Sequence, residues 1–437
     1  MCAQFNPDET SRQSMIEGRS SNSRLNAIVS AGVFLYFSLM FALPSGYSYG
    51  AILLLLGSFY FLAKGHGLTL SGEDKTIIYA FIGLFAWSAF IVLLHQNNPK
   101  TLDQTSRFLL AIPVLILLLH RPPRLRLVWA AVVVGIVLST GIAVWQLHWL
   151  NQPRAAGFLN IIHFGNIGLV FGVFCMAGML WARTQGQHAR AWRIAFLIGM
   201  CSSVYAIVAS GSRGSWLAVP PVLLLFVAAF LHKKNIKYAA GGAVFVVTAT
   251  AALFSIPETG IEQRYDLAVT EVEKYQQHKY VGQGEAVSSV GARLEVWRTA
   301  LMNIPQKPWL GWAEDDYHAE LQRLVQAKEI DPYMLNMANA HNNYLEVLLL
   351  QGVVGLIALL AVFVLPLWFF CKRLRSSDIT VKALALCGSS LVASYMMFAI
   401  SQVILGRNNG VIFYVLTLAI VWACMRQEEK RGLHGPT

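Results

Sequence analysis

Long apolar runs recur along the whole chain of 437 residues, and they restrict its fold more than any other feature. Each run approaches the ~20 residues that an α-helix needs to cross a bilayer. Hydrophobic residues make up 56% of the chain and charged residues 13%, whereas soluble domains carry roughly 25% charged residues. The sequence therefore predicts an all-α polytopic membrane protein. Its twelve predicted spans are residues 26–43, 46–63, 76–95, 106–120, 126–147, 160–182, 192–209, 215–231, 236–254, 342–370, 381–404 and 409–425.

The distribution of Lys and Arg predicts the orientation, because cytoplasmic loops carry an excess of these residues. With both termini in the cytoplasm, every inner loop is basic. The net charge of +11 is then mainly a topology signal and does not indicate a nucleic-acid surface. The short outer loops keep only Lys100, Arg107, Arg154, Arg213 and Arg407.

One connection is much longer than the others, and we expect it to form a small helical domain on the outer face. The first 25 residues lack the apolar core and cleavage site of a signal peptide. None of the six cysteines lies in the long loop, so neither a disulfide framework nor a cysteine metal site is expected. The predicted parts are an inner tail (1–25), spans 1–9 (26–254), the outer loop domain (255–341), spans 10–12 (342–425) and a second inner tail (426–437).

Arg213 lies in the segment SGSRGSWL, a short outer turn between two predicted spans. Gly211 and Gly214 would let the backbone approach a ligand closely, and Ser212 or Ser215 could cap the next helix. A helix N-terminus beside an arginine favours an anion. Arg213 is therefore either an anion-binding residue or an interfacial side chain that reaches the headgroups.

Arg293 falls on the apolar face of a predicted amphipathic helix that ends at Pro305. At about 100° per residue it shares that face with Trp297 and Ala300, whereas Arg298 points away. A solvated arginine would lie on the opposite face. Two interpretations follow: Arg293 binds an anion, or it forms a structural ion pair with a carboxylate of the loop.

His341 stands at the start of the apolar run in the segment ANAHNNYLEVLLLQGVVG. A helix that continued through it would place His341, Leu345, Gly352 and Gly355 on one face, where glycines let a neighbouring helix approach. At a helix N-terminus the dipole disfavours imidazolium, so the neutral ring could accept a proton. The alternative is a capping or interface histidine.

The segment AEDDYHAE offers a second group of polar side chains. Glu314, Asp315, Asp316 and His318 could form a metal cluster or supply a carboxylate base. Consecutive acids near a helix start also form a solvated first turn, because the helix dipole favours them there. The segment therefore has a functional and a structural interpretation.

Arg154, with His163 and Gly165, could line the outer end of a span or belong to an interfacial loop. The chain contains no phosphate-binding glycine loop, zinc-protease motif or serine elbow. Acidic residues are nearly absent from the spans, which argues against a proton-coupled transporter.

The pattern around the histidine resembles that of bacterial O-antigen ligases, a branch of the O-antigen polymerase and ligase superfamily. In these ligases a histidine is followed by Asn, Ser or Gln, nine residues, Gly, two residues, and Gly, Thr or Tyr. The resemblance covers most of the chain, including the spans, the inner termini and the long outer loop before the tenth span. Here the matching residues are His341, Asn342, Gly352 and Gly355, and a looser Arg-x-x-x-Leu pattern matches Arg213–Leu217.

The resemblance implies a membrane-embedded glycosyltransferase of the GT-C class in the inner membrane of a Gram-negative bacterium. It would transfer polysaccharide from undecaprenyl pyrophosphate to a sugar hydroxyl of lipid A–core, with inversion, at a site facing the periplasm. His341 would be the base, Arg213 and Arg293 would bind the pyrophosphate, and Arg154 is a further donor-binding candidate. No cofactor and no metal would be required.

Three alternatives stay open on the sequence alone. An O-antigen polymerase would use the same donor with a second lipid-linked repeat as acceptor. The Arg154 to Gly165 spacing fits such enzymes, but no arginine of the long loop repeats it. A protein O-oligosaccharyltransferase usually carries an added C-terminal portion. A non-enzymatic transporter of lipid-linked sugars would line its span interiors with charge.

Overall fold

The computed structural model describes residues 24–65, 67–230 and 289–434. Every regular element in these three ranges is a helix, so the all-α prediction is confirmed there. The predicted ninth span, 236–254, lies outside the described residues. The count of twelve spans and the GT-C class therefore stay predictions.

The described helices coincide with the other predicted spans, and the chain is a multi-pass membrane protein. Nine helical stretches are long and apolar enough to cross a bilayer, and the segments Arg24–Ser38 and Gly214–Phe230 are shorter, all within the described ranges. The apolar helices after Arg24–Ser38 are α2 (Gly46–Ala63), α3 (Gly72–His95), α4 (Leu102–His120), α5 (Leu125–Val144), α6 (Ile161–Trp181), α7 (Ala189–Ser210), α8 (Val219–Phe230), α13 (Asn343–Cys371), α14 (Ile379–Ser401) and α15 (Asn408–His434).

Three predicted boundaries are wrong. The helix of the first span, expected at 26–43, ends at Ser38. The span expected at 106–120 starts earlier, because a turn capped by Asn98 leads into the helix and makes a stretch of 22 residues, Pro99–His120. It is therefore long enough to cross the bilayer without thinning it. The helix expected to end at residue 425 continues to His434, and Arg431 pairs with Glu428 one turn earlier, at 2.7 Å, as helix neighbours do.

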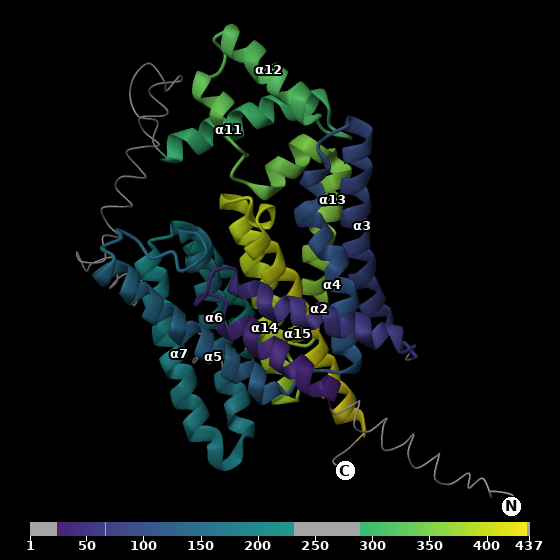
Figure 1. Ribbon diagram of the computed structural model, residues 1–437, viewed down its shortest axis with the longest axis vertical. Helices are drawn as coiled ribbons and strands as arrows, with labels where there is room; N and C mark the ends of the chain where they lie inside the picture. Colours follow the sequence, from purple (N-terminus) through teal and green to yellow (C-terminus); the bar gives the residue numbers. More distant parts are fainter. Residues whose placement is uncertain (1–23, 66, 231–288, 435–437) are drawn as a thin grey trace, which may run out of the picture.

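Helices α6, α14 and α15 are the most buried of the spanning helices. Figure 1 shows α14 and α15 in the middle of the bundle, with α3, α4 and α13 on one side and α5, α6 and α7 on the other. Buried tyrosines satisfy their hydroxyls within this core: Tyr395 donates to Gly410 O at 2.9 Å, and Tyr414 donates to Val362 O at 2.6 Å. Such partners are needed because lipid offers none.

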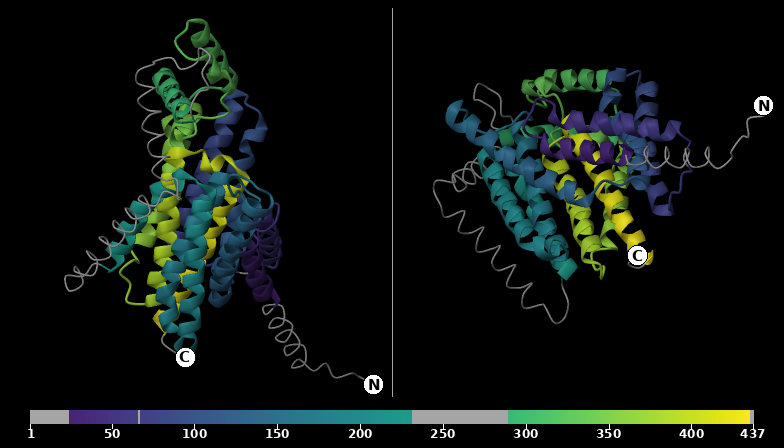
Figure 2. Two further views of the ribbon diagram at one scale, coloured as in Figure 1. Left: turned by 90° about the vertical axis from the view of Figure 1, so that its left-hand side faces the viewer. Right: turned by 60° about the horizontal axis from the view of Figure 1, so that its bottom comes forward.

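The outer domain covers one end of the bundle. Its described helices are α11 (Ser289–Asn303) and α12 (Glu314–Gln326), and both views in Figure 2 place them beyond the outer ends of α14 and α15. The amphipathic helix predicted before Pro305 is thus confirmed. The sequence also predicts a polar helix over residues 260–281, which lie outside the described residues.

The inner end of the bundle is fastened by an ion-pair network. Arg373 lies 2.6 Å from Glu73 Oε2 at the start of α3 and 2.6 Å from Glu429 Oε1 near the end of α15. Its side chain is largely buried, so the two carboxylates also satisfy a guanidinium that would otherwise be costly. Trp422 donates to the neighbouring Asp74 at 2.8 Å. This network fixes α3, α13 and α15 relative to one another.

Helix α13 is broken at Gly352, whose φ of 66° and ψ of −170° lie outside the helical region. The carbonyl of Leu349 accepts from Trp312 N at 2.8 Å, and Val353 N donates to Pro308 O at 2.8 Å. A Cβ on Gly352 would lie 2.1 Å from the carbonyl oxygen of Trp309. Gly352 therefore admits the backbone that precedes α12, and the predicted approach of a neighbouring helix there is wrong.

The second glycine of the motif behaves as predicted. A Cβ on Gly355 would lie 3.0 Å from Trp87 Nε1 on α3, and that indole nitrogen donates to Gln351 O at 3.0 Å. Gly355 thus permits a close contact between α13 and α3. The two glycines serve different contacts, one to the outer domain and one inside the bundle.

Changing Gly352 to alanine is expected to lower the free energy of unfolding by at least roughly 1–3 kcal/mol, because only glycine adopts this backbone region readily. The clash with Trp309 adds to that cost. Thermal unfolding of the purified protein in detergent measures the effect. The matched control is Gly141→Ala in α5, where a Cβ meets nothing within 4 Å and should be neutral or slightly stabilising. Equal melting temperatures for both variants would contradict the strain assigned to Gly352.

Candidate active site

His341 lies outside α13, so its predicted place on the helix is wrong. Helix α13 begins at Asn343, and the Asn342 side chain caps it by accepting from Tyr344 N at 2.9 Å and Leu345 N at 3.1 Å. An asparagine cap adopts an extended conformation and so ends the helix before the histidine. His341 itself has a φ of 50°. Its ring therefore does not stand above Gly352 and Gly355.

The end of α14 holds the imidazole. Nδ1 of His341 is 3.1 Å from Oε1 of Gln402, and Gln402 is only 5% exposed. A hydrogen bond from Nδ1 to this amide oxygen leaves Nε2 as the ring nitrogen available to a reacting group. The backbone of His341 is also held, since its N–H donates to Asn339 Oδ1 at 3.0 Å. The arrangement orients a ring that can take a proton at Nε2.

Arg213 opens the 3-10 segment η5 (Arg213–Ala218), beside the same end of α14. A Cβ on Gly214 would lie 2.9 Å from Ser401 Oγ, so this glycine admits α14 and not a ligand, contrary to the prediction. The predicted serine cap is also absent from this segment: Ser212 makes no side-chain cap bond, and Ser215 donates to Asn166 Oδ1 at 2.8 Å. The backbone of Arg213 thus lies near the residues that hold His341.

Arg154 fastens the end of α7. Its Nε donates to Ser210 O at 2.6 Å and its Nη2 to Gly211 O at 2.8 Å. These carbonyls belong to a helix C-terminus, where a cation is favoured. Gly211 has a φ of 58° and is the left-handed residue that ends the helix. Arg154 therefore supports the turn that carries Arg213, which the sequence did not indicate.

Helix α11 contacts the His341 segment from the other direction. Trp297 Nε1 donates to Ala340 O at 2.9 Å, and Arg293 lies one helical turn before Trp297. Ala300, on the same predicted face, is fully buried. Arg298 points elsewhere, as predicted, and bonds Glu295 and the carbonyl of Glu329. The structure thus places the helix that carries Arg293 against the residue before His341.

Gln402 is the residue of this region that sequence reasoning missed. It follows Ser401 at the outer end of a predicted apolar span, and no spacing rule connects it with a histidine 61 positions away. The only available indication was a polar side chain, partly at membrane depth, near other polar residues. Its role becomes visible only once α13 and α14 are packed together.

The acidic segment at the start of α12 divides into two kinds of residue. Asp315 and Asp316 are exposed, and the neighbouring Lys307, 2.8 Å away, lowers the pKa of Asp316. Glu314 borders two cavities, and partial burial together with Asp315 raises the pKa of its carboxyl group. No group of three metal-binding side chains occurs in the described part of the chain. Glu314 is exposed as well, so the solvated-turn interpretation fits all three acids, and Glu314 in addition borders the two cavities.

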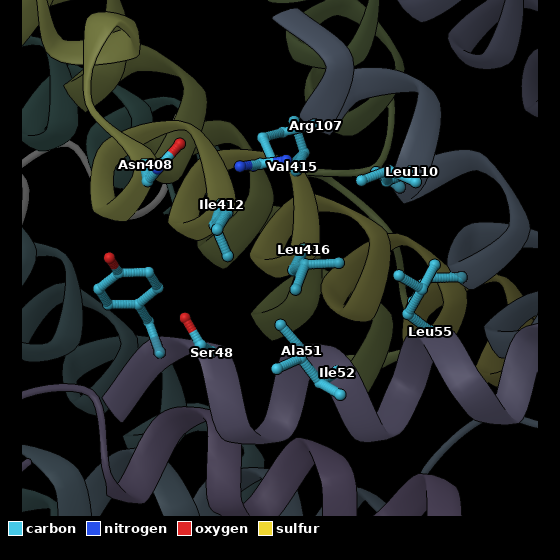
Figure 3. Close-up of a pocket in the computed structure, with 13 residues that line it drawn as sticks. Ser48, Ala51, Ile52, Leu55, Arg107, Leu110, Asn408, Ile412, Val415 and Leu416 are labelled. Carbon is cyan, nitrogen blue, oxygen red and sulfur yellow. The ribbon is translucent and has the colours of Figure 1, made fainter. Parts of the chain in front are cut away.

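An apolar groove of about 300 Å³ lies between α2, α4 and α15. Figure 3 shows Arg107 and Asn408 near its α4 and α15 walls, with Ala51 and Ile52 opposite on α2. Arg107 pairs with Asp103 at 2.7 Å. Tyr47 and Ser48 line the groove as well, and all four polar residues belong to the outer ends of their helices, whereas the deeper lining is aliphatic. The groove therefore fits an apolar chain whose polar end lies at the outer surface.

Comparison with known proteins is consistent with the resemblance to O-antigen ligases. The pattern of the family described as O-Antigen ligase matches residues 194–360, a range that contains Arg213, Arg293 and His341 but not Arg154. A Haemophilus influenzae protein named "Uncharacterized protein" is 28% identical over 406 residues, which cover 92% of this chain and 98% of that protein.

Two relatives named "O-antigen ligase" are more distant. The Escherichia coli protein is 22% identical over 259 residues, which are 56% of this chain and 57% of the relative. The Pseudomonas aeruginosa protein is 24% identical over 306 residues, which are 68% of this chain and 66% of the relative. The chain thus spans somewhat more than half of the first and about two thirds of the second.

Proposed function

We propose that this protein, a member of the O-antigen ligase family, transfers a polysaccharide from undecaprenyl pyrophosphate to a sugar hydroxyl of lipid A–core. The observation that carries the proposal is the imidazole of His341, held through Nδ1 by Gln402 at the outer end of the bundle. The match of the family pattern to residues 194–360 supports it, because this range includes the histidine and two of the candidate arginines. We place the reaction at the periplasmic face of a bacterial inner membrane.

The chemistry requires a base and a cationic site for the leaving group. In the proposed step, the acceptor hydroxyl forms a bond to the anomeric carbon, its proton passes to Nε2 of His341, and the bond from that carbon to the pyrophosphate oxygen breaks. Displacement in one step inverts the anomeric centre. A positioned base contributes roughly 10²–10⁴-fold to such a rate.

Arginines are suited to the leaving group, since the guanidinium binds phosphate oxygens in pairs. Arg293 lies one turn from Trp297, which bonds the residue before His341. Arg213 begins the segment beside Ser401. We assign pyrophosphate binding to these two, and to Arg154 the support of the Arg213 turn through its bonds to Ser210 and Gly211.

The apolar groove supports a lipid-linked donor. Its aliphatic lining begins at the outer ends of α2, α4 and α15, and Leu405, just before α15, donates from its N–H to Asn343 Oδ1 at 3.0 Å. The segment from Gln402 to Asn408 thus joins the His341 neighbourhood to the mouth of the groove. A prenyl chain in the groove would keep its pyrophosphate on that side of the bundle.

Cells that lack this protein are expected to accumulate long lipid-linked chains and to carry lipid A–core without polysaccharide. Gel electrophoresis of lipopolysaccharide together with analysis of the lipid-linked pool measures both quantities. Restoring the intact gene is the control and should return the long chains to the core. A core that bears single repeats would instead identify a polymerase, and an unchanged core would exclude both activities.

A further inference from the structure

A second cavity, of about 310 Å³, lies in the outer domain. Its walls come from α11, from α12, from the strip of residues that leads to His341, and from the first turns of α13. We call it the polar cavity. Its size reaches the lower end of the range of small-molecule sites, roughly 300 Å³, and it is large enough for a single sugar ring. The polar residues that matter below are Thr299, Glu314, Tyr317, Asn339 and Glu346.

The floor of the polar cavity carries a hydroxyl with no partner. Thr299 is 1% exposed, and its Oγ1 makes no hydrogen bond within the described part of the chain. A helical threonine usually bonds a carbonyl of the preceding turn, and a buried polar atom left unpaired is costly. Its hydroxyl therefore indicates a missing hydrogen-bonding partner inside the cavity.

Two carboxylates stand on the walls. Glu346 accepts from Ala340 N at 2.7 Å through Oε2, which leaves its other oxygen for a second donor. Glu314 lies at the exposed rim, and among the described residues no side-chain bond of its carboxylate occurs. No lysine or arginine lines the cavity. His318 also lines the cavity, so the wall presents two acids and one imidazole, with no lysine or arginine beside them.

The two acids in the wall determine which kinds of ligand fit the polar cavity. Two nearby carboxylates repel a phosphate or pyrophosphate, so the charged end of the donor does not fit. Sugar hydroxyls do fit, because each can donate to a carboxylate and accept from a hydroxyl or an amide. The ring of Tyr317, half-buried in the wall, offers an apolar face to the C–H side of a sugar.

The position of the polar cavity relates it to the proposed reaction. Ala338, Asn339 and Ala340 line it, and the next residue is His341, whose ring is held toward Gln402. The polar cavity therefore borders the backbone that carries the proposed base.

We propose that the polar cavity binds a sugar of the acceptor oligosaccharide, through Thr299, Glu314 and Glu346, beside the segment that carries His341. The identification of the bound sugar as part of the acceptor rests on the proposed function. The existence of a sugar site rests on the cavity alone.

The test uses the purified full-length protein and a defined probe, the core oligosaccharide freed of lipid A, with binding measured by calorimetry. Thr299→Val removes the floor hydroxyl and keeps the shape, and Glu314→Ala removes the rim carboxylate. Each is expected to weaken binding about tenfold, as the loss of a hydrogen bond to a charged or buried partner does. Asp315→Ala is the control, because it removes an exposed acid of the same helical turn that does not line the cavity, and it should bind as the original protein does.

Transfer assays add a second readout. With lipid A–core and the lipid-linked donor, both variants should raise the KM for the acceptor about tenfold and leave the KM for the donor unchanged. A rise confined to the donor KM, equal binding by all variants, or no binding by the original protein would overturn the assignment. If the probe binds and the variants weaken it, but no transfer occurs, the sugar site stands and the proposed function fails.

Discussion

Replacing His341 by asparagine is expected to lower the rate of transfer by about 10²–10⁴-fold, the usual contribution of a positioned base. Asparagine is the suitable substitute because His341 has a φ of 50°, and asparagine adopts the left-handed region with little strain. The variant removes the proton acceptor while the backbone bond to Asn339 can persist. Initial rates at saturating donor and acceptor measure the effect.

Two further measurements make the result specific. Donor affinity should be unchanged in His341→Asn, because the pyrophosphate is assigned to arginines on other elements. His188→Ala, at an exposed position in a 3-10 turn at the inner end of α7, is the matched control and should keep full activity. Full activity of a correctly folded His341→Asn protein would remove His341 from the mechanism.

Replacing Arg293 by lysine is expected to lower transfer by about 10²-fold or more, within the range that follows loss of one group stabilising developing charge. Lysine keeps the charge but not the planar fork that binds two phosphate oxygens at once. The loss should fall on the KM for the donor and on kcat together, since pyrophosphate charge grows as the bond breaks. Steady-state kinetics with varied donor concentration separates the two.

The same helix supplies the control for Arg293. Arg298→Lys changes an arginine that bonds Glu295 and Glu329 on the outer domain itself, so it should cost some stability and leave the donor KM unchanged. If Arg293→Lys lowered the melting temperature with normal kinetics, the ion-pair interpretation of Arg293 would be correct and its pyrophosphate role would fail.

The hydrophobic pattern predicted the helices of the bundle well, because a bilayer demands apolar length and little else. It failed where short polar residues decide a boundary. Asn342 caps α13 and so excludes His341 from the helix. The helical period of 3.6 residues, taken alone, would have placed both residues in the helix. At the start of α4, a turn capped by Asn98 extended a span that hydropathy alone made too short.

The candidate site could be predicted only in part. The ligase-like motif predicted His341 as a candidate, and the pattern of one helical face predicted Arg293, because both patterns involve residues close in sequence. The bond of His341 to Gln402 and the bonds of Arg154 to Ser210 and Gly211 join separate elements. Such partners depend on how α7, α13 and α14 pack, and no local pattern encodes that packing.

The break in α13 has a consequence for how the outer domain can move. Main-chain hydrogen bonds from Trp312 to Leu349 and from Val353 to Pro308 cross the break, so the loop before α12 takes the place of a missing turn of helix. Separating the domain from the bundle would expose these amides and carbonyls at the edge of a low-dielectric region, where each unpaired group is costly. Proteins open locally in units whose hydrogen bonds break together. The loop before α12 and the outer half of α13 therefore form one cooperative unit.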